Sequence, residues 1–169
     1  MLIAHHDHRN GTVRWSTGPM GGVFSSTALA GGFGDDVGHH VAVAAVDEWP
    51  VALAFQDASR QRLNLLYGSQ ANTLTPGFDE AGGKGIALAM RLDGTVILAH
   101  GSADGTAVRV LWGVPGNWTA YSPPLVDHVG RFNALLVDGD LAKVAVLIDR
   151  LDARLQPSPA IEILTVVID

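Results

Sequence analysis

Three histidines and one aspartate occupy four consecutive positions near the start of the sequence, at His5, His6, Asp7 and His8. Imidazole nitrogens and carboxylate oxygens are ligands of Zn²⁺ and similar ions, so the run has the residue types of a metal site. In a strand, alternation sends His5 and His8 to opposite faces. His6 and His8 are therefore the metal-ligand candidates of the run, with Asp7 as an outer partner.

A second pair, His39-His40, follows in the segment that leads into the next apolar run, and His39 could complete such a site. The spacing is looser than that of structural zinc motifs. No metal or other cofactor is predicted on this basis, and His6, His8 and His39 remain candidates.

Other reactive patterns are absent from the sequence. It contains no cysteine, no Gly-x-Ser-x-Gly nucleophile turn and no Gly-x-x-x-x-Gly-Lys phosphate loop. The carboxylate pairs Asp35-Asp36 and Asp79-Glu80 are interpreted as solvated acids in linkers. We therefore predict a protein that is not an enzyme.

Composition sets the broad class. The chain has 169 residues with 47% hydrophobic and 17% charged residues, which is typical of one folded domain. Its net charge of -6 argues against a nucleic-acid partner. No apolar stretch reaches the roughly 18 residues of a membrane span or the about 7–15 of a secretory signal. With Met1 as the natural start, we expect a cytoplasmic protein with no membrane partner.

The elements that must position these residues are short strands. Glycine and proline interrupt the chain at short intervals, and the runs between them are rich in Val, Ala, Leu and Ile. Leu141–Leu155 has some helical character, but its β-branched residues favour a strand. The predicted strands are 41–46, 51–55, 63–67, 86–90, 96–99, 108–112, 134–137, 144–148 and 161–167.

Several of these runs repeat. VALAFQDASRQRLNLLYG at 51–68 aligns without a gap with VILAHGSADGTAVRVLWG at 96–113, at an offset of 45 residues. The opening segment joins at an offset of 50 residues, which places Ala4 on Ala54 and Asp7 on Asp57. A further copy begins at Val144. Repeats of roughly 40–50 residues with four strands each are typical of β-propeller blades.

The fold class predicted is therefore all-β, a single propeller-like domain over 1–169 with repeat units of about 45–50 residues. The approximate units are 1–34, 35–78, 79–126 and 127–169, holding three, four, four and three strands. The pattern resembles sialidase-like repeat propellers, with about three and a half blades per chain. That family's Asp-box turn survives only in broken form, as Ser102-Ala103-Asp104-Gly105. The resemblance implies the fold; the arginine triad that sialidase activity needs has no counterpart.

An incomplete ring exposes strand edges and apolar faces that need a cover. We expect a homodimer that closes the ring, with a compact four-bladed monomer as the competing closure. The chain itself and a peptide or protein segment are the predicted partners.

The predicted ligand face consists of the turns between second and third strands. Each such turn carries an aspartate, Asp7, Asp57, Asp104 or Asp149, which we interpret mainly as turn formers. The position after the shared alanine varies between repeats, as His5, Phe55 and His100, with Ile148 in the last copy. An exposed Trp is typical of recognition or dimerisation surfaces. The predicted ligand-binding residues are His5, His6, Trp49, Phe55, Gln56, Arg60, His100 and Asp104.

The function predicted first is a non-catalytic protein that binds a peptide or protein segment on the open face or at a strand edge. Presentation of a precursor peptide to the enzymes of a bacterial natural-product pathway is one such accessory role. A glycan-binding propeller lectin is the alternative, and a metal-dependent or divergent hydrolase is the second alternative.

Overall fold

The structure is a computed structural model. It describes residues 1–47, 50–68, 75–82, 84–102, 106–123, 128–151 and 157–168. In these ranges no helix is long and apolar enough to span a membrane. The strands are β1 (Leu2–Asp7), β2 (Thr12–Thr17), β3 (Ser25–Gly31), β4 (Val37–Ala45), β5 (Val51–Asp57), β6 (Arg62–Gly68), β7 (Thr75–Ala81), β8 (Lys84–Met90), β9 (Val96–Gly101), β10 (Val108–Val114), β11 (Asn117–Tyr121), β12 (His128–Asp138), β13 (Leu141–Leu151) and β14 (Pro157–Val167).

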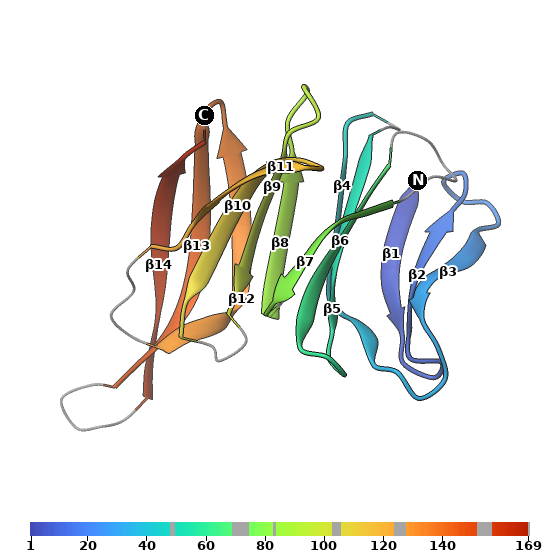
Figure 1. The fold of residues 1–169 in the computed structure, drawn as a ribbon, viewed down its shortest axis with the longest axis horizontal. Helices are drawn as coiled ribbons and strands as arrows, with labels where there is room; N and C mark the ends of the chain where they lie inside the picture. The colour runs from blue at the N-terminus through green and yellow to red at the C-terminus, as the bar shows by residue number, and fades with distance from the viewer. Residues whose placement is uncertain are drawn as a thin grey trace.

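The strands form four antiparallel sheets in which each strand pairs with its neighbour in the chain. The first sheet holds β1–β3, the second β4–β7, the third β8–β11 and the fourth β12–β14. Figure 1 shows the sheets side by side in chain order, from the blue first sheet on the right to the orange and red fourth sheet on the left. The predicted all-β, propeller-like fold is confirmed. Ring closure by a second copy stays a prediction.

The strand register repeats between sheets. Ala4 lies opposite Trp15 in the first sheet, Ala54 opposite Leu65 in the second, and Ala99 opposite Val110 in the third. These three alanines are the ones that the sequence repeat superimposes. The repeat therefore identifies β1, β5 and β9 as equivalent second strands, and the sheets hold three, four, four and three strands as expected.

Strand bounds extend beyond the predicted runs. The segment at 141–151 with some helical character is strand β13, as its β-branched residues indicated. Strand β7 continues to Ala81, so it crosses the approximate unit boundary between residues 78 and 79. The strands of the fourth sheet each have 11 residues and are longer than the runs predicted there.

The core lies between successive sheets. In β5, Ala52 and Ala54 pack toward the third sheet, whereas Leu53 and Phe55 pack toward the first. Strand β9 likewise presents Leu98 to the second sheet and Ile97 to the fourth. Both strands are buried on their two faces, which explains why their sequences are continuous apolar runs instead of alternating ones.

Among the described residues, the fourth sheet is covered on one face only. Val144, Val146 and Val166 pack against the third sheet. On the opposite face, apolar side chains remain in solvent: Leu136, Ile161, Ile163 and Val167 are 62%, 73%, 66% and 59% exposed. The face that a further blade would cover in a closed propeller is therefore open here.

Candidate functional site

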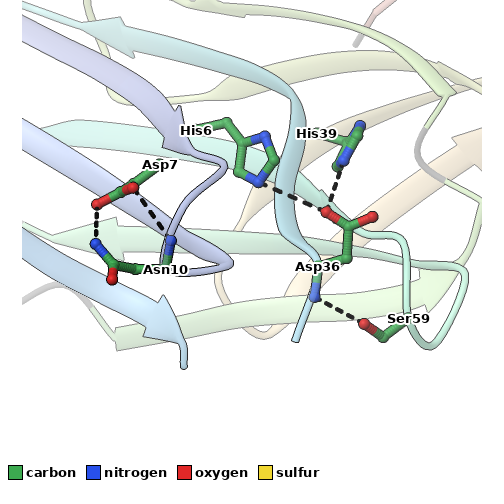
Figure 2. A network of polar contacts seen from close by, with 6 residues as sticks. All are labelled: His6, Asp7, Asn10, Asp36, His39 and Ser59. Atoms are coloured by element: carbon green, nitrogen blue, oxygen red, sulfur yellow. Dashed lines mark hydrogen bonds and ion pairs between the residues drawn. The ribbon is translucent and has the colours of Figure 1, made fainter. Parts of the chain in front are cut away.

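The histidine run and the segment that leads into β4 meet at the junction of the first and second sheets (Figure 2). His39 Nε2 lies 2.7 Å from Asp36 Oδ1, and His6 Nε2 lies 3.6 Å from the same oxygen. The rings of His6 and His39 are 4.5 Å apart, and those of His6 and His8 are 5.7 Å apart. One ligand atom each from His6, His8 and Asp36 falls within 4.8 Å of the others.

Hydrogen bonds from two neighbouring turns hold the main chain at Asp36. The main-chain N–H of Asp36 donates to Ser59 Oγ at 2.8 Å, and its carbonyl accepts from the N–H of Ala58 at 2.8 Å. The next residue, Val37, donates to the carbonyl of Gly11 at 3.3 Å. Asp36 is therefore held between the β1–β2 turn and the β5–β6 turn.

Close approach of β4 to the histidine requires a glycine. Gly38 has a φ of +111°, and a Cβ there would lie 3.1 Å from Val13 Cα and 3.3 Å from His6 Cδ2. A side chain at this position would push β4 away from β1 and β2. Gly38 thus lets the start of β4 pass directly over His6.

Electrostatics favour a neutral His6. Its pKa is lowered, first by burial and then by the nearby imidazole of His39, and Asp36 opposes these effects in part. Among the described residues, His6 Nε2 is buried without a hydrogen-bond partner. A neutral imidazole with an unengaged nitrogen is the form that binds a metal ion.

Asp7 lies apart from this cluster and shapes its own turn. Its carboxylate accepts from the backbone N–H of Asn10 at 3.3 Å and from Asn10 Nδ2 at 2.8 Å. Asp57 does the same in the second sheet, accepting from the backbone N–H and the guanidinium of Arg60 at 3.0 and 2.7 Å. Equivalent aspartates thus form equivalent turns, in accord with the turn-forming interpretation.

A second histidine–carboxylate contact lies between the second and third sheets. His100 is 1% exposed, and its Nε2 lies 2.5 Å from Glu80 Oε1. Its Nδ1 lies 2.9 Å from the carbonyl oxygen of Gly101. Arg109 Nη2 approaches the other carboxylate oxygen of Glu80 at 3.4 Å. Both ring nitrogens of His100 therefore face oxygen acceptors.

The remaining predicted ligand-binding residues differ in burial. His5 is half-buried and lies opposite Arg14 in the strand pair, whereas Phe55 is 2% exposed and belongs to the core. Gln56 is buried, and its side-chain amide donates to the carbonyl of Gly82 at 3.4 Å. Arg60 is exposed beside Asp57. Trp49 and Asp104 lie outside the described residues. A ligand role for all of these residues stays a prediction.

The interpretation of Asp36 and Glu80 as solvated linker acids has two outcomes. Asp36 does lie in the linker before β4 with its side chain 48% exposed, and it also contacts His39. For Glu80 the interpretation is wrong, because its side chain is 17% exposed and faces His100. Glu80 also lies within strand β7 and not in a linker. Glu80 and His100 are 20 positions apart in the sequence and lie in different sheets, so the local spacing of residues does not indicate their contact.

A different kind of candidate site is the free edge of the fourth sheet. In the second and third sheets the third strand, β6 or β10, pairs with a fourth strand, β7 or β11. The equivalent third strand of the fourth sheet is β14, which pairs with β13 and with no further strand among the described residues. Its free edge adjoins the exposed row of Ile161, Ile163 and Val167.

Comparisons with known proteins give a likeness at the level of structure. No protein-family model matches the sequence, and no curated protein matches it. Among the similar solved structures is a mutant of the Aleuria aurantia lectin in complex with alpha-methyl-L-fucoside, with a TM-score of 0.49 and 12% sequence identity. The likeness covers 99% of this chain, which spans 60% of that chain's length. The sialidase-like type stays a prediction.

Proposed function

We propose that this chain is a non-catalytic protein-binding module that takes up an extended peptide segment along the free edge of β14. One observation carries the proposal: the second and third sheets each have a fourth strand, whereas among the described residues no strand pairs with the same edge of the fourth sheet. An unpaired strand edge offers a row of backbone N–H and C=O groups to an added strand.

The surface beside this edge indicates the chemistry of the segment. An added strand places alternate side chains on the open face of the fourth sheet, next to Ile161, Ile163 and Val167. These three side chains are apolar and exposed, and Thr165 between them is uncharged. The segment is therefore extended and apolar at alternate positions.

A second copy of the chain is the competing occupant. In a head-to-tail ring, the open face of the fourth sheet would meet the outward face of the first sheet of a second copy. Arg14 lies on that first sheet and is bonded to Ser26 by its Nε at 3.0 Å, and Asp7 lies 3.9 Å from its guanidinium. An apolar face does not match this polar surface, which favours a peptide as the occupant.

Selection from a random peptide library tests the proposal. We expect enriched peptides with apolar residues at alternate positions, bound with an affinity that Ile163→Lys lowers at least about tenfold, because a charge on an edge strand blocks pairing. Thr119→Lys, on the exposed strand β11, is the matched control and should leave the affinity unchanged. Hydrogen exchange should slow at backbone amides of β14 when the peptide binds.

Two results would contradict the proposal. The first is a selection that yields no alternating apolar pattern, or peptides whose binding Ile163→Lys leaves intact. The second is a stable dimer in sedimentation that Ile163→Lys dissociates, since a second copy would then occupy the edge.

A further inference from the structure

We propose that His6, His8 and Asp36 bind a Zn²⁺ ion that joins the first sheet to the second, with His39 holding the carboxylate from the outside. The site lies at the other end of the molecule from the fourth sheet and is independent of peptide binding there. It uses three side chains from two sheets, at a place that the backbone has already fixed.

The distances are close to those that a metal ion requires. With metal–ligand bonds of about 2.0–2.2 Å, two ligand atoms of a tetrahedral ion lie about 3.3–3.6 Å apart. His6 Nε2 and Asp36 Oδ1 are 3.6 Å apart. One ligand atom each of His6, His8 and Asp36 lies within 4.8 Å of the other two, and His8 is an exposed residue of a turn. On our proposal, the exposed His8 side chain moves closer to complete the set when the ion binds.

The cluster has a buried polar atom that makes no hydrogen bond among the described residues. This atom is His6 Nε2, which is aimed toward Asp36. Buried polar atoms normally have a partner, and a metal ion would supply one.

His39 has the position of a supporting group. It lies 2.7 Å from Asp36 Oδ1, so its N–H donates to the carboxylate that would bind the ion. Such outer hydrogen bonds orient metal-binding carboxylates. Asp36 is thereby fixed by its side chain through His39 and by its backbone through Ser59.

The donor set selects the class of ion. Two imidazole nitrogens and one carboxylate oxygen suit Zn²⁺ and neighbouring divalent transition metals, whereas Ca²⁺ and Mg²⁺ prefer oxygen ligands throughout. Three protein ligands leave one tetrahedral position open for water or for a donor atom of a bound molecule.

Calorimetric titration of the tag-free, chelator-treated chain with Zn²⁺ tests the proposal. We expect one ion per chain and no displacement by Ca²⁺ or Mg²⁺. His8→Ala and Asp36→Asn should each weaken binding by more than roughly 100-fold, and His39→Ala by about 10–100-fold. His5→Ala, one residue from His6 and outside the cluster, is the matched control and should bind as the unchanged chain does.

X-ray absorption of the Zn²⁺-loaded chain with its sequence unchanged identifies the ligands of the ion directly. This measurement needs no substitution, so misfolding of a variant cannot affect it. Two imidazole ligands are expected. The proposal is overturned by the absence of stoichiometric binding, by fewer than two imidazoles at the ion, or by binding that survives both His8→Ala and Asp36→Asn. A loss with His39→Ala as large as with those two variants would overturn the supporting role of His39.

Discussion

Replacement of Glu80 by alanine should destabilise the protein far more than loss of its exposed partner Arg109. His100 is 1% exposed, and its two ring nitrogens face Glu80 Oε1 and the carbonyl of Gly101. Both of those oxygens are hydrogen-bond acceptors, so the imidazole has a contact at each of its ring nitrogens. Glu80→Ala removes the acceptor and leaves a buried imidazole nitrogen facing a cavity.

The magnitude follows from the burial of the pair. Removing one member of a buried ion pair costs about 3–5 kcal/mol. Because the Glu80 side chain keeps 17% exposure, we expect the lower end, about 3 kcal/mol. For a chain of this length the melting temperature should fall by about 6–12 °C. Glu80→Gln keeps an acceptor oxygen and should cost about 1 kcal/mol.

Urea unfolding with linear extrapolation measures these differences in the free energy of unfolding. The variants can be compared directly when this free energy falls with urea concentration at the same slope in each of them. Arg109→Ala is the matched control. Its side chain is 44% exposed and 3.4 Å from the same carboxylate, so its loss should cost at most about 1 kcal/mol. If Glu80→Ala costs no more than Arg109→Ala, the contact of Glu80 with His100 is not the buried interaction that the geometry indicates.

Further predictions concern the core, the sheet junction and one turn. Leu53→Ala, between the first and second sheets, should cost about 2–5 kcal/mol in urea unfolding. Gly38→Ala should cost more than about 1–2 kcal/mol, because its φ is positive and the new Cβ meets Val13. Zn²⁺ at about 100 times its Kd should raise the free energy of unfolding by about 2.7 kcal/mol, and a chelator should reverse this gain. The backbone N–H of Thr95 donates a hydrogen bond to Asp93 and lowers its pKa from the ordinary value of 3.8. The contribution of Asp93 to the free energy of unfolding is therefore present above pH 3.8 and is lost as the pH falls below that value. Asp93→Asn should remove that part of the acid dependence of the unfolding midpoint.

The sequence was informative about strands because the sheets impose simple rules on it. Turn residues mark where strands end, and strands buried on both faces, such as β5 and β9, are continuous apolar runs. The repeat then identified equivalent strands, since the same pairing recurs at Ala4, Ala54 and Ala99. Local composition and self-similarity were enough for these features.

The candidate site was harder to predict because it depends on which face of an outer sheet is covered. Alternation separates His5 from His6 but does not say which of them faces the second sheet. The repeat drew attention to His5, where the copies differ, whereas His6 is the one that meets Asp36. That contact also depends on the path of the linker into β4, which requires the positive φ of Gly38.

The two histidine–carboxylate contacts differ in a way that separates a structural role from an available site. Strand faces in this stack must be apolar to pack, so polar side chains gather where strands end, at His6 beside β4 and at His100 beside β7. His100 has an acceptor at each ring nitrogen and is fully buried, so no ring nitrogen remains for an ion. His6 keeps a buried Nε2 with no hydrogen bond among the described residues, next to a carboxylate already fixed in place. Of the two junctions, only the one between the first and second sheets therefore has both a free ligand atom and a fixed partner for a metal ion.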